Sequence, residues 1–534
     1  MTEEFDYIVV GAGSAGCVLA GRLSEDPGTR VLLLEAGPAD RSLWIHLPIG
    51  YGKTMWSPRV NWCFETEPDP NMNGRRIYWP RGKTLGGSSS INGLVCIRGQ
   101  ATDYDRWAEL GNVGWSHAEV LPYFIRSEGN VRGANAWHGT DGPLKVSDIP
   151  AGNELIEAFI AAAGEIGVPR NDDFNGTTQE GAGYYQLTTR NGWRWSAARA
   201  YLEPARRRTN LRIETAAHAS AVDFEGRRAT GVRYLQKGTV RHARARGEVL
   251  LAAGAIQSPQ LLQLSGIGPP DLLQRFGIPV VQVAHGVGEN LQDHLQMRLV
   301  YECTRPITTN DQLNSVLGRG KIGLEWLLRR TGPLAIGINQ GGCFMRALPA
   351  STTPDIQFHV ATLSADMAGG KVHPFSGFTF SVCQLRPEAR GHIRIRSPNP
   401  LQPPAMQPNY LSTDVDRMVA VAGVKAARAI AAAPSMRPYV KREVRPGPVA
   451  TSDDELLEFC RDSGATIFHP SGTCRMGIDA MAVLDERLRV RGVGGLRVVD
   501  CSAMPTLVSG NTHAPVVMMA EKAVDMVRAD ARRT

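Results

Sequence analysis

The chain has 534 residues, which is more than one hydrophobic core usually serves, so we expect two domains or two interleaved layers. Hydrophobic residues make up 43% and charged residues 21%, values typical of soluble globular proteins, which excludes a fibrous or intrinsically disordered chain. The net charge of +7 is small for this length and lies in short clusters, so nucleic-acid binding is not predicted.

Cysteine spacing and the first residues indicate the cellular compartment. Nine cysteines are spread along the chain without a CxxC pair or a short-spaced cysteine and histidine set, which predicts reduced thiols and no metal site. The first residues, MTEE, lead directly into an apolar strand and lack the features of a signal peptide. No apolar run approaches the ~18 residues that a membrane-spanning helix needs. We therefore expect a cytoplasmic protein whose membrane contact, if any, is peripheral and at the inner face.

Residues 5–37, FDYIVVGAGSAGCVLAGRLSEDPGTRVLLLEAG, predict a strand, a glycine turn, a helix and a second strand. Two short apolar runs flank a segment in which Leu19 and Leu23 have helical spacing. The strands are almost continuously apolar, as in a parallel sheet covered on both faces. This segment is therefore a predicted βαβ unit.

The turn of this unit carries the dinucleotide-binding pattern GxGxxG. Gly11 permits a tight turn, Gly13 lets a pyrophosphate approach the backbone, and Gly16 allows close packing of helix and sheet. The helix N-terminus also offers free N–H groups to phosphates. Glu35 is expected to be ionised and to bind a ribose diol, which does not distinguish FAD from NAD. The predicted contacts of this cradle also include Ser14, Ala15 and Ala36.

Later segments alternate between two kinds of strand. Short strands and turns precede an apolar run at 249–252, which predicts another buried strand. Residues 391–398, GHIRIRSP, alternate apolar and polar side chains, which is typical of a half-exposed antiparallel strand. The last segment predicts a buried strand and then a helix from about Ala514, so the chain is expected to return to its first domain.

Three motifs resemble the signatures of one enzyme family. The first is RGKTLGGSSSINGLVCIRG at 81–99, and the second is GAIQSPQLLQLSGIGP at 254–269 with GVGENLQDH at 286–294. The third is FHPSGTCRMG, followed by LRVVDCSAMPTLVSGNTHAP. In this order, they make nearly the whole chain similar to the glucose-methanol-choline (GMC) oxidoreductase family, and within it to choline, aliphatic-alcohol and sorbose dehydrogenases.

The resemblance implies an α/β fold, α+β overall, with a Rossmann-like FAD-binding domain and an interleaved substrate domain built on an antiparallel sheet with helices. Residues 1–297 are then expected to be mainly FAD-binding, and 298–380 to form the central part of the substrate cavity. Residues 381–534 are expected to supply the substrate sheet and to return to the FAD domain with the catalytic histidines.

The resemblance also implies FAD as the cofactor. The glycine and serine residues of the first motif offer a small backbone with exposed N–H groups that can approach a planar ring and phosphate oxygens. Asn92 is expected to meet the polar edge of the flavin. Some family members attach FAD through a histidine just before this asparagine, and Ile91 at that position predicts non-covalent binding. The other implied contacts are Gly86, Gly87, Ser88, Gly93, Val95, Val222, Asp500, Cys501 and His513.

Alcohol oxidation requires loss of the hydroxyl proton together with hydride transfer to the flavin. An imidazole suits the role of proton acceptor because its pKa lies near neutral pH. By family position, His469 is the expected base. His513 matches the second active-site position, where it can donate a hydrogen bond to the forming alkoxide or share the role of base. The other ten histidines, including His138 and His294, are expected to have scaffold roles.

The implied substrate is a small-molecule alcohol, with a primary alcohol expected, and the implied electron acceptor is oxygen or a quinone-type carrier. Four side chains of the central segment are candidates for an apolar pocket: Trp326, Phe344, Met345 and Phe358. An alternative function is a flavin-containing lyase of the cyanohydrin-cleaving type, because that chemistry also uses a histidine base.

Overall fold

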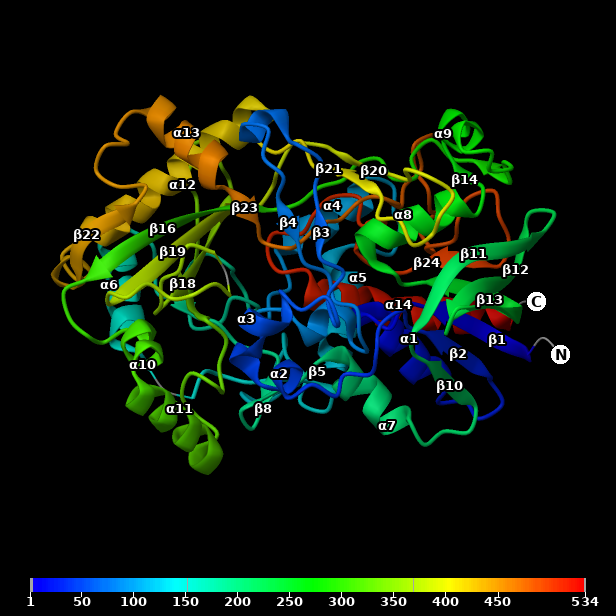
Figure 1. Cartoon of the computed structure of the whole chain (residues 1–534), viewed down its shortest axis with the longest axis horizontal. Coiled ribbons are helices and arrows are strands. Elements are labelled where there is room, and N and C mark those ends of the chain that lie inside the picture. The colour runs from blue at the N-terminus through cyan, green and yellow to red at the C-terminus, as the bar shows by residue number, and fades with distance from the viewer. Residues whose placement is uncertain (1–2, 151, 368, 533–534) are drawn as a thin grey trace.

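The computed structural model describes residues 3–150, 152–367 and 369–532. Two large sheets organise these residues, one at each side of the view in Figure 1. The first sheet has the strand order β10-β2-β1-β13-β12-β11, with β24 paired to β13. Its strands are β1 (Glu3–Val10), β2 (Val31–Leu34), β10 (Leu211–Glu214), β11 (Ala217–Glu225), β12 (Arg228–Gln236), β13 (Thr239–Leu251) and β24 (Leu496–Val498).

The first sheet contains the predicted βαβ unit. β10, β2, β1, β13 and β24 run parallel, whereas β11 and β12 extend the sheet in antiparallel pairs. Every residue of β2 is buried, as a parallel strand covered on both faces requires. The helices α1 (Ser14–Leu23) and α14 (His513–Ala531) pack against one another on this sheet. The last strand and last helix thus bring the C-terminal segment back to the N-terminal cradle, as predicted.

The second sheet is antiparallel, with the order β22-β16-β19-β18-β17-β7 and β23 paired to β16. Its strands are β7 (Gly181–Tyr184), β16 (Leu295–Cys303), β17 (Asn339–Met345), β18 (Ile356–Ala361), β19 (Gly377–Gln384), β22 (Val440–Arg445) and β23 (Ala465–Thr466). The helices α6 (Glu154–Glu165) and α12 (Asp414–Ala432) cover one face, where Phe159 packs against Phe358 and Phe380. Because side chains alternate along a strand, the neighbours of these core residues face the other way.

The expected divisions at 297/298 and 380/381 fall inside β16 and β19. The two sheets interleave along the chain, since β7, which precedes strands β10 to β13 of the first sheet, joins the second sheet, and β24 from the last segment joins the first. A division into consecutive segments therefore separates residues that belong to one strand.

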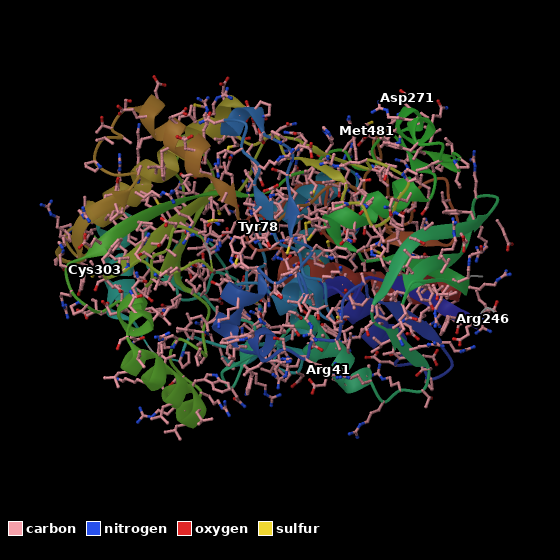
Figure 2. The ribbon with its side chains drawn as sticks, in the orientation of Figure 1. Arg41, Tyr78, Arg246, Asp271, Cys303 and Met481 are labelled. Atoms are coloured by element: carbon pink, nitrogen blue, oxygen red, sulfur yellow. The ribbon has the colours of Figure 1, made fainter. Side chains whose placement is uncertain are left out.

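Shorter elements connect the sheets. The helices are α2 (Leu43–His46), α3 (Tyr51–Thr54), α4 (Ala101–Glu109), α5 (His117–Ser127), α7 (Glu203–Ala205), α8 (Gly254–Leu264), α9 (Pro270–Arg275), α10 (Thr309–Asn314), α11 (Val316–Arg329) and α13 (Asp453–Ser463). The paired short strands are β3 (Phe64–Glu65) with β4 (Tyr78–Trp79), β5 (Glu128–Asn130) with β6 (Leu144–Val146), β8 (Thr189–Arg190) with β9 (Trp193–Arg194), β14 (Ile267–Gly268) with β15 (Gln282–Val283), and β20 (His392–Arg394) with β21 (Ala405–Gln407). β20 is the antiparallel strand predicted from GHIRIRSP, although it is shorter than that segment. Figure 2 shows the side chains on these elements, with Tyr78 near the centre of the view. Within the described ranges, no helix combines the length and the apolar character needed to cross a bilayer.

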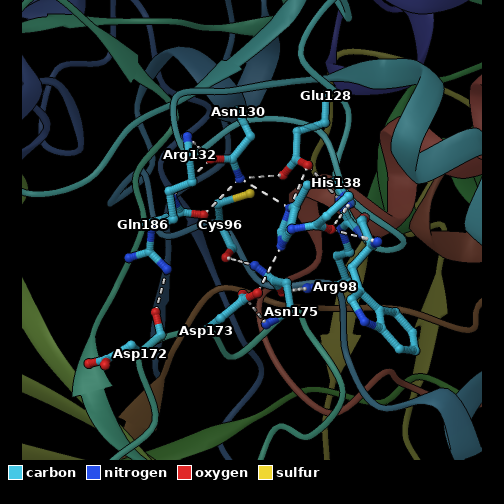
Figure 3. Close-up of polar contacts among 12 residues, drawn as sticks. Cys96, Arg98, Glu128, Asn130, Arg132, His138, Asp172, Asp173, Asn175 and Gln186 are labelled. Carbon is cyan, nitrogen blue, oxygen red and sulfur yellow. Dashed lines mark hydrogen bonds and ion pairs between the residues drawn. The ribbon is translucent and has the colours of Figure 1, made fainter.

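A buried charged network lies outside the cavity described below (Figure 3). Arg98 pairs with Glu128 at 2.7 Å, and His138 contacts the same carboxylate at 2.7 Å and Asp173 at 2.9 Å. Burial acts to lower the pKa of His138, but its hydrogen bonds to Asp173 and Glu128 outweigh it and raise this pKa to about 9. The network ties β5 to the loop that contains Asp173, which is a scaffold role of the kind expected for this histidine.

Candidate active site

A cavity of about 710 Å³ lies between the two sheets, within the size range of small-molecule sites. The first sheet and its loops contribute Gly11, Gly13, Glu35 and Ala36 to the wall. The second sheet contributes Gln296, Arg298, His359, Ala361 and Ser381, which alternate along their strands with core residues. C-terminal loops contribute His469 and Asn511, and the start of α14 contributes His513. The N-terminal glycines and the C-terminal imidazoles therefore meet in one cavity.

Glu35 is fixed at the end of β2 by the glycine turn. Its carboxylate accepts hydrogen bonds from the N–H groups of Ala12 at 2.9 Å and Gly37 at 2.8 Å. Burial raises the pKa of Glu35 to about 7, while these two donors act in the opposite direction. Burial thus opposes the full ionisation expected from sequence, but the carboxylate remains a positioned acceptor at the cavity wall.

Two glycine-rich segments lie against one another at the cradle. Gly86 N–H donates to the carbonyl of Ala12 at 2.7 Å, and a Cβ on Gly87 would lie 2.7 Å from Cα of Gly13. A Cβ on Gly16 would lie 1.8 Å from the carbonyl oxygen of Gly11, so this position requires glycine for packing. Gly16 and Gly86 support the turn from outside the cavity lining, whereas Gly13 and Gly87 form part of it.

Arg194, which has no motif in the sequence to indicate it, holds the loop that carries Asn92. Its side chain is 1% exposed and donates to Oδ1 of Asn92 at 2.6 Å, to the Ser89 carbonyl at 3.1 Å and to the Ile45 carbonyl at 2.8 Å. Burial lowers the pKa of Arg194 to about 9, so that it remains a cation at neutral pH. Oδ1 of Asn92 therefore already accepts a hydrogen bond from within the protein.

Most of the other expected cofactor contacts line the cavity. These are Ser14, Ala15, Ser88, Gly93, Val95, Asp500 and Cys501. The carboxylate of Asp500 accepts hydrogen bonds from Gly254 N–H at 2.8 Å and from the Ser258 hydroxyl at 2.6 Å, so it also fixes the start of α8.

Val222 does not line the cavity. It is buried in β11, and its N–H donates to the hydroxyl of Ser265 at 2.9 Å, which leaves this group no role at the wall. The residues of β11 that do line the cavity are Ala217, His218 and Ala219. The residues of this strand at the cavity wall therefore lie a few positions before Val222.

The loop that carries His469 is held on both sides. The backbone N–H of His469 donates to the carboxylate of Asp293 at 2.7 Å. The preceding residue, Phe468, has a left-handed backbone with φ of 73°. The carbonyl of Phe468 accepts a hydrogen bond from Arg81 at 2.6 Å, and its N–H donates to the Thr466 hydroxyl at 2.7 Å. These contacts fix the direction in which the imidazole of His469 enters the cavity.

Hydrogen bonds determine the tautomer of His469. The carbonyl of Leu385 can only accept, so Nε2 of His294, 2.9 Å away, carries a proton. Nδ1 of a neutral His294 is then an acceptor, and Nδ1 of His469, 3.0 Å away, must donate to it. The lone pair of His469 consequently lies on Nε2. His294 therefore contacts the candidate base directly, which the sequence alone does not indicate.

Asn511 is a second residue that sequence reasoning missed. Its Nδ2 lies 3.3 Å from Nε2 of His469, and its Oδ1 accepts a hydrogen bond from Gln357 at 3.2 Å. His513 instead directs Nδ1 to the hydroxyl of Ser14 at 2.9 Å, beside the glycine turn. Asn511 stands two residues before His513 in the same GNTHAP motif, which was the available signal. The structure thus pairs His469 with Asn511 and His513 with the cradle.

Burial is the main cause of the unusual acidities of both imidazoles. It lowers the pKa of His469 well below its ordinary value, and the nearby His294, His359 and Arg81 act in the same direction. Burial and the charge of Arg194 lower the pKa of His513 to about 4. Both rings are therefore neutral at pH 7, and the Nε2 lone pair of His469, which accepts the hydrogen bond from Asn511, can accept a proton from a substrate that displaces this contact.

The four side chains expected to form an apolar pocket lie elsewhere. Phe344 and Phe358 are fully buried in the core, and Trp326 packs against Trp193 with ring centroids 4.6 Å apart. Met345 ends β17 and, like the other three, is not among the lining residues. The cause is the register of the strands, because Phe358 faces the core while its neighbour His359 faces the cavity.

His513 and the glycine turn leave polar backbone and side-chain groups that a cofactor in the cavity can contact. Nε2 of His513 is buried and has no partner among the described residues, so a ligand in the cavity can satisfy it. A Cβ on Gly13 would meet only the Ala252 carbonyl at 3.8 Å, which leaves the approach to this backbone open from the cavity. Ile91, which also lines the cavity, has no nucleophilic atom for covalent attachment.

Comparisons with known proteins agree with this site. Residues 5–296 and 387–520 match the N-terminal and C-terminal profiles described as GMC oxidoreductase. The chain is 45% identical to an alcohol dehydrogenase [acceptor] of Pseudomonas putida over 98% of its own length and 95% of the relative's. It is 46% identical to the mitochondrial choline dehydrogenase of Homo sapiens, over 98% of its own length and 90% of the relative's.

Solved structures share the whole fold. Pyridoxine 4-oxidase from Mesorbium loti superposes with a TM-score of 0.89 at 31% identity, covering 98% of each chain. An FAD-dependent oxidoreductase from Chaetomium thermophilum superposes with a TM-score of 0.90 at 28% identity, covering 99% of this chain and 100% of that one. The chain therefore belongs to the GMC oxidoreductase family and is an FAD-dependent oxidoreductase that acts on CH–OH donors.

Proposed function

We propose that the chain oxidises a primary alcohol to the aldehyde, with His469 as the base that takes the hydroxyl proton. The hydrogen-bond chain from Leu385 through His294 to His469 carries this proposal, because it leaves the Nε2 lone pair directed into the cavity. Nδ2 of Asn511 donates one N–H to Nε2 of His469 at 3.3 Å, and its amide is placed to donate a hydrogen bond to the oxygen of a bound alcohol. When bound, FAD supplies the oxidised ring that accepts the hydride.

His513 has a different role in this proposal. Its contact with Ser14 and its unpartnered Nε2 support cofactor binding at the cradle rather than proton transfer. The expected FAD contacts that line the cavity form the proposed cofactor site, and Gly16 and Gly86 support them from behind.

The charges of the cavity favour an uncharged or anionic alcohol over a cationic one such as choline. Among the described lining residues, the only carboxylates are Glu35 and Asp500, and both already accept hydrogen bonds within the protein. On the wall formed by β16, Gln296 and Arg298 lie two positions apart and both face the cavity. Burial lowers the pKa of Arg298 only to about 10, so it is a cation at neutral pH. A quaternary ammonium group would meet this cation without a compensating carboxylate.

We further propose that a quinone-type carrier takes the electrons, and that the protein works in the cytoplasm with peripheral contact at the inner face of the membrane. The Pseudomonas putida relative is named for a general acceptor, and both relatives reported above are dehydrogenases. No nucleic acid is expected as a partner.

Anaerobic mixing of the purified holoenzyme with candidate alcohols tests the function. An uncharged primary alkanol should bleach the visible band of the oxidised flavin, whereas choline at the same concentration should do so at least about tenfold more slowly. Arg298→Glu should narrow or reverse that preference. Failure of every alcohol to bleach the flavin would refute oxidation and favour lyase chemistry, which leaves the flavin oxidised. Faster bleaching by choline would refute the proposed preference for uncharged or anionic alcohols but not alcohol oxidation itself.

A further inference from the structure

Helix α11 presents an apolar face to solvent. Val316, Leu317, Leu324, Leu327 and Leu328 are each between 56% and 86% exposed. At ~100° per residue these five positions fall within an arc of about 120°, so they form one continuous stripe along the helix. Most amphipathic helices turn such a stripe toward the core, and α11 turns it outward.

The opposite face of α11 anchors the helix to the protein. Ile322 is 4% exposed, and Trp326 donates from its indole N–H to the Gly192 carbonyl at 2.9 Å. Arg330 lies over the ring of Trp326 at 4.0 Å and closes the helix. The exposed stripe is therefore held in a fixed orientation. In Figure 1 the helix extends from the lower left edge of the molecule.

Cations lie on the same helix: around its axis Lys321 lies about 20° and Arg319 about 60° outside the arc of the stripe, one on each side, and Arg329 lies about 100° away from it. In the described part of the chain, the side chains of Arg319, Lys321 and Arg329 have no carboxylate or hydrogen-bond partner. Glu325 is the only acidic residue of α11, and it accepts a hydrogen bond from Thr331 at 3.2 Å. An apolar stripe flanked by unpaired cations is complementary to an anionic lipid surface, where each Lys or Arg adds to the attraction.

The same helix borders the active-site cavity. Arg319 and Ile322 line it, together with Leu313 from α10. Two further lining residues are themselves exposed apolar side chains, Trp44 at 39% and Met367 at 52%. The helix that carries the stripe thus also forms part of the cavity wall, and this wall has exposed apolar side chains of its own.

We propose that α11 inserts its apolar stripe into the surface of a bilayer that contains anionic phospholipid, and that the cavity receives a lipid-dissolved quinone there. The quinone part rests on the proposed function, because only an enzyme that passes electrons to such a carrier needs this access. The bilayer contact itself rests on the stripe, the unpaired cations and the anchored orientation.

Flotation of the holoenzyme with vesicles tests the contact. The parent should float with vesicles of phosphatidylcholine mixed with phosphatidylglycerol, and much less with phosphatidylcholine alone. Leu317→Glu combined with Leu328→Glu should lower the bound fraction about tenfold or more, because two charges would enter the lipid interface. A matched control with Val113→Glu and Leu401→Glu changes two other exposed apolar residues and should float like the parent. Lys321→Glu with Arg329→Glu should weaken binding to the anionic vesicles.

Activity measured in parallel separates the two proposals. All variants should keep parent activity with a water-soluble dye as acceptor, whereas the Leu317 and Leu328 variant should lose activity with a long-chain quinone embedded in vesicles. If the parent does not float, or if that variant floats equally, the bilayer contact is wrong even where alcohol oxidation is confirmed. If light scattering instead shows a dimer that the variant dissociates, and neither protein floats, the stripe binds a second copy of the chain and the proposal is wrong.

Discussion

Replacing His294 by Phe tests how the base is held in its reactive form. The change keeps a flat ring at the site but removes the acceptor for Nδ1–H of His469, which lies 3.0 Å away. An unsatisfied buried donor costs about 1–3 kcal/mol, and His469 can avoid this cost only by turning or by moving its proton to Nε2. Either response removes the Nε2 lone pair. At 1.4 kcal/mol per factor of ten, the reactive population should fall by about 5- to 150-fold.

Stopped-flow reduction of the flavin without oxygen measures this effect. The limiting rate at saturating alcohol should fall by that factor, while the FAD content and KM remain close to the parent, because His294 does not itself line the cavity and reaches it only through His469. His294→Gln should recover part of the rate, since its amide oxygen can accept the same hydrogen bond. A parent-like limiting rate in His294→Phe with full FAD content would refute the tautomer argument.

Two more predictions concern the cradle and the buried network. Gly13→Ala should keep the melting temperature of the parent, because the new methyl group would meet only the Ala252 carbonyl at 3.8 Å. Its affinity for FAD should fall at least about tenfold, because this methyl group would face the cavity. Gly16→Ala should instead lower the melting temperature, because the Cβ would lie 1.8 Å from the Gly11 carbonyl oxygen; equal Tm values for the two variants would contradict this distinction. The pKa of His138 rises from 6.5 to about 9 on folding, so its stabilisation, on the order of 3 to 4 kcal/mol, is complete below about pH 6.5 and is lost as pH rises through about 9. The midpoint of urea unfolding should fall as pH rises over this range in the parent and not in His138→Gln. If the midpoints of the two proteins changed with pH in parallel, the stabilising role of His138 would be disproved.

The parts of the site that could be predicted from sequence are those formed by residues that lie next to one another along the chain. The glycine turn and Glu35 follow from a local pattern between two strands, and each lies at the cavity as expected. The position of His469 followed from a family motif. Both kinds of pattern can be identified in the sequence without knowledge of long-range contacts.

The contacts that give His469 its tautomer could not be predicted, because they join distant parts of the chain. His294 lies 175 residues from His469, and Arg194 lies 102 residues from Asn92. No local pattern indicates such pairs. Asn511 could not be predicted for the same reason, because its contact joins it to His469, 42 residues away along the chain.

Strand register and helix orientation explain the remaining differences. A shift of one residue exchanges the two faces of a strand, so sequence alone could not decide whether Phe358 or His359 faces the cavity. Helical spacing in α11 likewise shows that its apolar residues share one face without showing whether that face meets the core or the solvent.

The rate of flavin reduction in His469→Ala is the decisive quantity for the proposed chemistry. The variant should bind FAD as the parent does, because its side chain is not required by the glycine cradle, and its anaerobic reduction by a primary alkanol should be about 100-fold slower or more. Reduction at the parent rate, with FAD fully bound, would show that His469 does not take the proton.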